Sequence, residues 1–231
     1  MRTQRTPIRP FFAALALVIG SVFAGAAWAQ DDDPVVLSVG DEERTLSQFE
    51  HRFDIALRSA AAQQGVPMDD EVRSQLEAYA GPFLEQLAQE LVWLNEADER
   101  GIEISEAEVD SIVAELRGEG DEAAFAELLD SSGIGDVDTL RTLVEEGERI
   151  GRLQERLAAE IDVSEEQVRE AYESTPEAAE LDFADVRDQI EAQLVSAEVQ
   201  AELNEIVAQA DVETFPEHLP YDTEPQEPAG F

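Results

Sequence analysis

Histidine is the side chain best suited to proton transfer near neutral pH, and this sequence has only two, His51 and His218. There is no cysteine to act as a nucleophile, and the patterns Gly-x-Ser-x-Gly, His-Glu-x-x-His and the P-loop do not occur. His51 lies beside the apolar stripe of an expected helix, which is typical of a surface position. Carboxylates are so frequent that no pair of them marks a site. The sequence therefore indicates no catalytic residue and no cofactor.

The segment from Asp130 to Asp138 resembles a calcium loop in its acidic and glycine-rich character. If Asp130 takes the first position, the twelfth falls on Arg141, where such a loop needs a bidentate glutamate. A helix that ends in a Gly133–Gly135 turn, followed by a helix capped by Asp138, explains the same residues. We therefore expect no metal site.

Apolar and aromatic side chains near helix ends are the remaining candidates for a binding site. An exposed apolar patch of a few hundred Å² is typical of an interaction surface. Each candidate could equally be an ordinary core residue, and the regular apolar stripe around Phe83 and Trp93 favours the core for those two. The candidate residues for such a surface are Met68, Tyr79, Pro82, Phe83, Trp93 and Phe125.

The charge of the chain is strongly one-sided, with 54 acidic residues against 15 arginines and no lysine, a formal net charge of −39. Nucleic acids and anionic membranes are bound mainly through Lys and Arg, so both are excluded as partners. Two interpretations remain open. The acidic surface could attract cationic partners, or it could be the solvated surface of a protein adapted to high salt.

The first 29 residues have the pattern of a signal peptide. Arginines precede an apolar run from Phe11, and Ala27-Trp28-Ala29 fits a signal-peptidase site. We expect cleavage after Ala29, an extracytoplasmic (periplasmic or secreted) protein and no stable membrane insertion afterwards. An uncleaved anchor is the alternative, because Phe11–Ala29 approaches the ~20 apolar residues that span a bilayer.

The remaining chain predicts helices separated by short turns. Val35–Val39 is a short β-branched strand before a turn at Gly40-Asp41. Thr45 is the expected N-cap of a helix with a capping box, and Ser105 and Ser164 are expected to cap two further helices in the same way. Gly81-Pro82 predicts a kink or break before the most regular apolar helix. Gly147 and Gly151 lie one turn apart in a long helix, where we expect close approach of a neighbouring helix.

The last helix is expected over 182–209 and packs back on the N-terminal part. Val212–Phe215 alternates apolar and polar residues like an edge strand that could pair with Val35–Val39. Residues 216–231 are rich in proline and acids, which predicts a disordered tail. The fold class is therefore all-α, a mainly helical orthogonal bundle, with a minor two- or three-stranded β element formed by the two ends. One domain is expected over residues 30–215.

Several of these segments resemble the SurA-like N-terminal domain of the exported foldases SurA, PpiD and PrsA. VVLSVGDEERTLSQFEHRF looks like its first strand, turn and helix, and LEQLAQELVWLNEADERGIEISEAEVDSIVAEL is similar to its leucine-rich helix and Ser-capped successor. AEIDVSEEQVREAYES resembles the segment that leads into a parvulin prolyl-isomerase domain, and LDFADVRDQIEAQLVSAEVQAELNEIVAQADVETF resembles the helix that follows that domain. The likeness covers about 35–215.

The resemblance implies a chaperone domain without its catalytic insertion. Residues 174–181 stand where a parvulin domain of about 100 residues would be inserted. The family function implied is an ATP-independent holdase that binds unfolded or nascent exported polypeptides in an apolar cradle, as a monomer or homodimer. The resemblance makes the six candidates for an apolar surface the candidate peptide-binding residues. Two alternatives remain: a degenerate or non-catalytic relative of the peptidyl-prolyl isomerases, and an envelope scaffold that binds one fixed partner.

Overall fold

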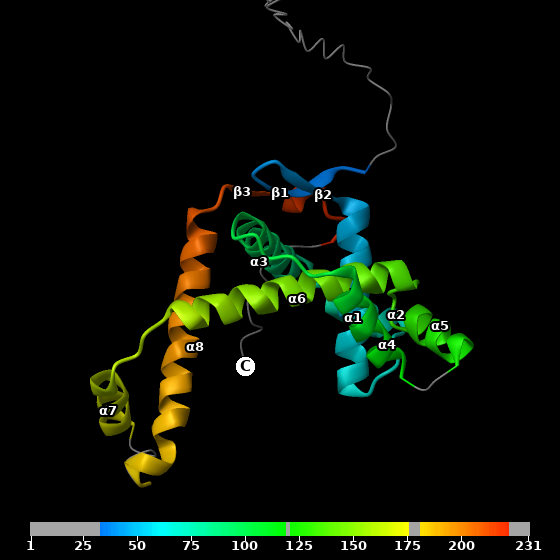
Figure 1. The fold of residues 1–231 in the computed structure, drawn as a ribbon. Coiled ribbons are helices and arrows are strands. Elements are labelled where there is room, and N and C mark those ends of the chain that lie inside the picture. Colours follow the sequence, from blue (N-terminus) through cyan, green and yellow to red (C-terminus); the bar gives the residue numbers. More distant parts are fainter. Residues whose placement is uncertain (1–32, 119–120, 176–180, 222–231) are drawn as a thin grey trace, which may run out of the picture. The chain divides into compact units, whose positions relative to one another are not determined.

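The computed structural model describes residues 33–118, 121–175 and 181–221. In these residues the chain forms eight α-helices and a small three-stranded antiparallel sheet (Figure 1). The expected fold class, a helical bundle with a minor β element from the two ends, is confirmed. The expected signal peptide lies outside the described residues.

The sheet joins the beginning and the end of the described chain. Strand β1 (Val35–Val39) is central, with β2 (Glu42–Thr45) on one side and β3 (Val212–Thr214) on the other. Leu37 lies opposite Thr214, and the amide of Gly40 donates to the carbonyl of Asp211 at 3.0 Å. The pairing of the two ends predicted from the alternating pattern is therefore confirmed.

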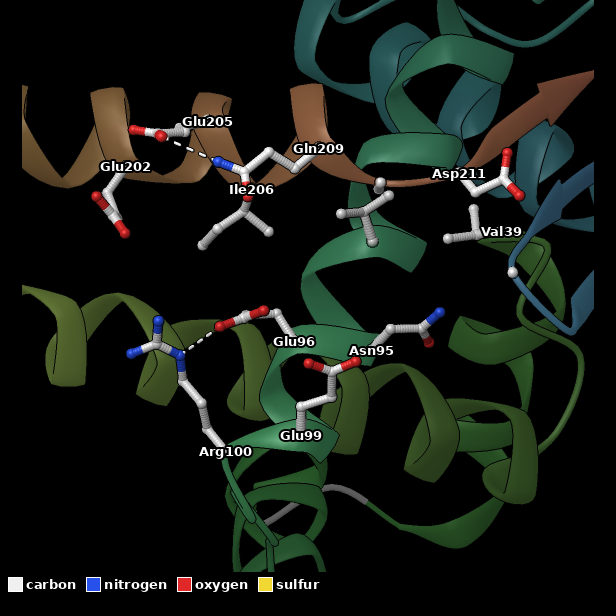
Figure 2. A pocket seen from close by; sticks show the side chains of 13 residues that line it. Val39, Asn95, Glu96, Glu99, Arg100, Glu202, Glu205, Ile206, Gln209 and Asp211 are labelled. Atoms are coloured by element: carbon white, nitrogen blue, oxygen red, sulfur yellow. Dashed lines mark hydrogen bonds and ion pairs between the residues drawn. The ribbon is translucent and has the colours of Figure 1, made fainter.

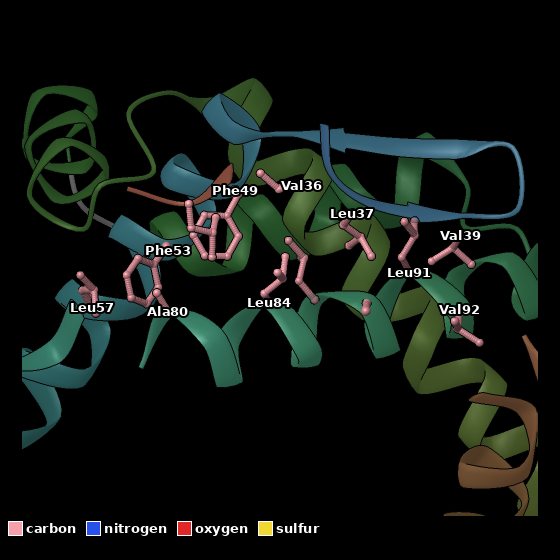
Figure 3. Packing of buried hydrophobic residues seen from close by; sticks show 13 residues of the cluster. Val36, Leu37, Val39, Phe49, Phe53, Leu57, Ala80, Leu84, Leu91 and Val92 are labelled. Carbon is pink, nitrogen blue, oxygen red and sulfur yellow. The ribbon is translucent and has the colours of Figure 1, made fainter. Parts of the chain in front are cut away.

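Helices α1 (Leu46–Gln64), α2 (Asp70–Glu77) and α3 (Ala80–Glu99) follow the sheet. The capping box at Thr45 is present, as predicted. The inward side chains of β1, α1 and α3 form the first core cluster, in which Phe49 stacks on Phe53 with ring centroids 5.5 Å apart (Figure 3). This cluster holds the sheet on the two helices.

Helices α4 (Glu106–Arg117), α5 (Glu122–Ser131) and α6 (Val137–Glu160) pack around the third core cluster, which includes Val109 and Leu140. Ser105 caps α4 with the expected capping box. The prediction that Asp138 caps α6 is wrong, because the side chain of Asp136 accepts the hydrogen bond from the Thr139 amide at 2.7 Å. Either aspartate could satisfy a free N–H of the first turn, so local sequence could not choose between them.

The two glycines of α6 also differ from expectation. A Cβ placed on Gly147 or Gly151 would meet no atom within 4 Å in the described part of the chain. No helix among these residues approaches them, so the prediction of close helix packing is wrong. A glycine inside a helix costs about 0.5–1 kcal/mol relative to alanine, and packing within the described residues does not offset that cost.

Helices α7 (Glu165–Ser174) and α8 (Phe183–Gln209) form a pair around the fourth core cluster, Val168, Val186 and Ile190. Ser164 caps α7 as predicted. The C-terminal part of α8 packs on α3 and α6, where Leu203 joins Ala97, Leu153 and Leu157 in the second cluster. The long last helix therefore returns to the N-terminal part of the chain, as expected.

The prediction of a disordered tail from residue 216 onwards is wrong for residues 216–221. Pro216–His218 form the 3-10 helix η2, and Leu219 is buried in the first core cluster. His218 Nδ1 lies 2.6 Å from the carbonyl oxygen of Val35, and Tyr221 packs against the same cluster. The compositional signal was misleading here because one leucine and one tyrosine suffice to dock the segment. Residues 222–231 lie outside the described part.

Candidate peptide-binding surfaces

The junction between α2 and α3 exposes an aromatic residue. Asp69 caps α2 by accepting a hydrogen bond from Val72 at 2.9 Å, and α2 ends at Glu77. Tyr79 is the N-cap of α3, and Pro82 lies in the first helical turn, where its missing N–H needs no partner. The expected interruption therefore occurs at residues 78–79, just before Gly81-Pro82. Tyr79 is left 61% exposed.

Three further candidates lie beside this junction or its core. Phe83 accompanies Tyr79 one turn along α3, and its amide donates to the Tyr79 carbonyl at 2.9 Å. Its ring is partly buried against Phe49 and Phe53, at centroid distances of 5.6 and 5.2 Å. Met68 packs on the same first cluster, and Pro82 is exposed. The junction thus presents an exposed aromatic next to partly buried apolar side chains.

The other two candidates lie elsewhere. Trp93 packs with the second core cluster, and its Nε1 donates to the carbonyl of Leu203 at 3.4 Å. Phe125 is 7% exposed in the third cluster between α4, α5 and α6. The structure does not bring these two side chains to the α2–α3 junction. For Trp93 and Phe83 the apolar stripe had already favoured a role in packing.

Tyr221 is an aromatic neighbour of the junction that sequence reasoning missed. Its ring lies 5.5 Å from Phe53 and 6.4 Å from Phe49. Burial, followed by the negative charges of Glu50 and Glu77, raises the pKa of the Tyr221 hydroxyl. The sequence signal for it was the single Leu219-Pro220-Tyr221 apolar run within an otherwise acidic tail.

A second candidate surface is an open cleft of about 570 Å³ between the C-terminal halves of α3 and α8 (Figure 2). Val39, Val92 and Ile206 contribute apolar surface. Carboxylates from both helices and from the residue before β3 line it. The acidic residues that line the cleft are Glu96, Glu99, Glu202, Glu205 and Asp211.

Arg100 supplies positive charge to the lining of this cleft, and its guanidinium is already paired. Its Nε donates to Glu96 at 2.5 Å and its Nη1 to Glu160 at 3.2 Å. The hydrogen bond to Glu96 is the main reason why the pKa of Arg100 is raised. The other carboxylates of the lining give the cleft a negative potential that favours cationic groups.

The family of the chain follows from comparison with known proteins. A family model described as the SurA-like N-terminal domain matches residues 1–145. The chain belongs to this family. A relative is the chaperone SurA of Chromobacterium violaceum, 29% identical over 177 residues that cover 73% of this chain and 40% of the relative. The chain thus matches less than half of the length of that relative.

The SurA-like chain described here has no parvulin domain between its last two helices. Helix α7 ends at Ser174 and α8 begins at Phe183, so only a short connection separates them. The Tyr172 hydroxyl donates to the Leu181 carbonyl at 2.7 Å, and the Tyr172 and Phe183 rings meet edge to face at 5.2 Å. These contacts hold the two helices together directly across the connection.

The positions of the histidines and of possible metal ligands were compared in this SurA-like chain. His51 lies on α1 and His218 on η2. Within residues 33–118, 121–175 and 181–221, no three His, Asp or Glu side chains are placed to hold a metal ion. Among the same residues, no helix combines the length and apolar character needed to cross a bilayer.

Proposed function

We propose that this chain is an exported, ATP-independent chaperone that binds unfolded or nascent polypeptides and limits their aggregation. The proposal rests on the SurA-like N-terminal domain, together with the aromatic residues at the α2–α3 junction. Tyr79 is exposed one turn before Phe83, whose ring packs on the first core cluster, so an apolar client segment could bury the Tyr79 ring. Apolar burial contributes roughly 25 cal/mol per Å² and does not depend on one client sequence.

The acidic surface complements this apolar contact. Clients with Lys or Arg beside apolar residues would be attracted by the α3–α8 cleft, whereas acidic clients would be repelled. The large net negative charge also keeps complexes of chaperone and client apart from one another. Basic and neutral segments are therefore the preferred clients.

The cellular place of this activity is part of the proposal. The signal-peptide pattern of residues 1–29 directs the chain to the periplasm or to another extracytoplasmic compartment. The working domain comprises residues 30–215 together with the docked segment 216–221. It acts as a monomer or a homodimer.

Aggregation assays test the proposal. The purified protein should suppress light scattering by several unrelated unfolding clients at a few-fold molar excess. Tyr79→Asp places a charge in the aromatic junction and should weaken suppression several-fold. Leu128→Asp is a matched control, because Leu128 is 56% exposed on α5 and not at the α2–α3 junction, and it should behave like the wild type.

Two outcomes of parallel assays would overturn the proposal. Clear turnover of a prolyl-isomerase substrate by the purified chain would favour an isomerase. Suppression restricted to one client, with no effect on the others, would favour a scaffold for a fixed partner.

A further inference from the structure

The docked segment of residues 216–221 covers the aromatic end of the first core cluster. Phe49 and Phe53 lie next to each other at this end (Figure 3). Leu219 is buried in the same cluster, and the Tyr221 ring centroid lies 5.5 Å from that of Phe53 and 6.4 Å from that of Phe49. The segment therefore packs one apolar and one aromatic side chain against the cluster.

The covered rings continue into the α2–α3 junction. The Phe83 ring centroid lies 5.2 Å from that of Phe53, and the Phe83 amide donates to the Tyr79 carbonyl. Tyr79 is 61% exposed, whereas Phe49 and Phe53 are 0% and 2% exposed. If the docked segment moved away, the ring faces beneath Tyr221 would extend the apolar surface of the junction. Aromatic side chains bury roughly 150–250 Å² each, so even partial uncovering of two rings would add on the order of 100 Å².

Two contacts tie the start of the segment to β1. The Phe215 amide donates to the Val36 carbonyl at 2.9 Å. His218 Nδ1 lies 2.6 Å from the Val35 carbonyl oxygen, and the His218 ring stacks on Phe215 with centroids 5.5 Å apart. His218 is exposed, so this anchor lies at the surface of the molecule.

The sequence of the docked segment keeps its contacts few. Pro216 and Pro220 have no N–H, so the ladder between β1 and β3 cannot continue along the segment. The Leu219 amide donates to the Pro216 carbonyl at 3.1 Å, within the turn of the segment itself. Of the six residues, Leu219 alone is buried, and Tyr221 is half-buried. A segment with so few buried contacts opens at a lower free energy than the fold as a whole.

We propose that residues 216–221 are an intramolecular competitor, which opens when a client binds and closes again when the client leaves. The proposal rests on the chaperone function proposed above and adds its regulation. An apolar client segment at the junction and the docked segment require the same faces of Phe49 and Phe53, so binding of one excludes the other. Leu219 and Tyr221 offer these rings the kind of contact that a client offers.

Covalent attachment makes the competitor effective. A segment on a short link acts at an effective concentration of about millimolar, whatever the concentration of the protein. The apparent Kd for a client is the intrinsic Kd divided by the fraction of open molecules, so a segment open in about 1% of molecules weakens binding about 100-fold. Weakly bound clients are thus rejected. Closure also prevents a client from rebinding after it dissociates, so release needs no nucleotide.

Substitutions in the segment test the competition. Tyr221→Ala removes the ring that packs on the two phenylalanines, and His218→Ala removes the anchor at Val35 without changing the aromatic cluster. Glu217→Ala, at an exposed position of the same turn, is the matched control. The probe is fluorophore-labelled, reduced and carboxamidomethylated lysozyme, a basic unfolded polypeptide, in an anisotropy titration. We expect Tyr221→Ala to lower Kd at least fivefold, His218→Ala at least threefold, and Glu217→Ala to change it less than twofold.

A second control separates opening of the segment from general loosening of the fold. Leu140→Ala removes a buried side chain from the third core cluster, away from the docked segment. Thermal melting verifies that each variant is folded at the temperature of the titration. If Leu140→Ala lowered Kd as much as Tyr221→Ala, tighter binding would follow from loosening alone and the proposal would be overturned.

Hydrogen exchange followed by NMR reports on the segment directly. With saturating probe, the amides of Phe215, His218 and Leu219 should exchange faster, because the segment is open in the complex. The Gly40 amide, which donates to the Asp211 carbonyl outside the segment, should exchange as before. Slower or unchanged exchange of the three amides would overturn the proposal, since the client would then bind to a closed molecule.

The outcomes separate the regulation from the function. If the wild type and all variants bind the probe with the same Kd, the competitor is overturned while the chaperone function stands. Weaker binding by Tyr221→Ala would make this ring part of the client site and would also overturn the competitor. Binding by Tyr221→Ala but not by the wild type would support complete closure. If no form of the chain binds, the proposed function fails and its regulation fails with it.

Discussion

The amide of Phe215 donates a hydrogen bond to the carbonyl of Val36 at 2.9 Å and so ties the last strand of the described chain to the first. The pairing of β1 with β3 fixes where α8 returns, because α8 leads directly into β3. Helix α8 then forms one side of the acidic cleft against α3. The acidic cleft between α3 and α8 therefore depends on the pairing of β1 with β3.

The docked segment after β3 should contribute measurably to stability. Leu219→Ala removes a buried side chain from the first core cluster and should lower the free energy of unfolding by about 2–4 kcal/mol. Urea denaturation followed by circular dichroism measures the change. Glu217→Ala, at an exposed position of η2, should stay within about 0.5 kcal/mol of the wild type. Equal midpoints for both variants would mean that the segment is not docked.

The turn between α5 and α6 depends on a glycine that contacts α1. Gly133 has φ +81°, and a Cβ there would lie 2.8 Å from Asp54 Oδ2 and 2.9 Å from Arg58 Cδ. Burial would raise the pKa of Asp54, but hydrogen bonds from Arg73 and Arg58 outweigh it and lower that pKa. These ion pairs hold the carboxylate in place, so it cannot move aside easily.

Two alanine variants isolate this contact. Gly135 has a similar φ of +85° but open space around its Cβ, so Gly135→Ala should cost only the left-handed backbone strain, about 1–2 kcal/mol. Gly133→Ala should cost at least about 1 kcal/mol more because its Cβ overlaps α1 side chains. The comparison is made by urea denaturation. A smaller loss for Gly133→Ala than for Gly135→Ala would contradict the packing described here.

Much of the fold could be predicted because its signals are local. The capping boxes at Thr45, Ser105 and Ser164 are hydrogen-bond patterns within three residues, and all three are present. The pairing of the two ends was predictable because the alternation of apolar and polar residues is still recognisable in the three-residue strand β3. Strand β2 was not foreseen as a separate element, since Glu42-Glu43-Arg44-Thr45 has little strand preference and forms by pairing with β1.

The candidate site was less predictable, because exposure depends on tertiary contacts. Tyr79 and Phe125 both stand near a helix end in sequence, yet one is exposed and the other is buried by α4 and α6. Gly147 and Gly151 predicted a packed neighbour, but a Cβ at either position meets no atom within 4 Å in the described part of the chain. Spacing along a helix shows which residues share a face, but not what covers that face.

The open glycines lead to a stability prediction. Gly151→Ala should raise the free energy of unfolding by about 0.5–1 kcal/mol, because alanine has the higher helix propensity and its Cβ meets no atom of the described residues within 4 Å. Differential scanning calorimetry should show a higher melting temperature. A lower melting temperature would mean that another element packs closely on this face of α6.

The cap of α4 should make stability depend on acid pH. Hydrogen bonds from the Ser105 hydroxyl and amide, and then from Arg152, lower the pKa of Glu108 from 4.5 to about 2. Because the folded-state pKa is below the unfolded value, the carboxylate stabilises the fold fully above about pH 4.5. This contribution is lost as the pH falls towards 2.

Substitution of Glu108 tests this dependence. The melting temperature of Glu108→Gln should be lower than that of the wild type at pH 6, and the difference should shrink as the pH is lowered from 5 to 2. Glu103→Gln, at an exposed position before α4, serves as the control and should follow the wild type throughout. A difference that stays constant with pH would contradict the assigned pKa.

The net charge predicts a dependence on salt. Acidic residues repel one another in the folded state, and this repulsion is screened over about 10 Å at 0.1 M ionic strength. The melting temperature should therefore rise as NaCl is increased from a few millimolar to about 1 M. A flat response would show that self-repulsion contributes little to the stability of the fold.

The central claim is that this SurA-like chain binds unfolded polypeptides of unrelated sequence without nucleotide. An anisotropy titration of three unrelated labelled unfolded polypeptides, with and without ATP, tests it most directly. Saturable binding of all three, unchanged by ATP and tighter for basic than for acidic sequences, is the predicted result. Absence of saturable binding, or binding of one sequence alone, would contradict the claim.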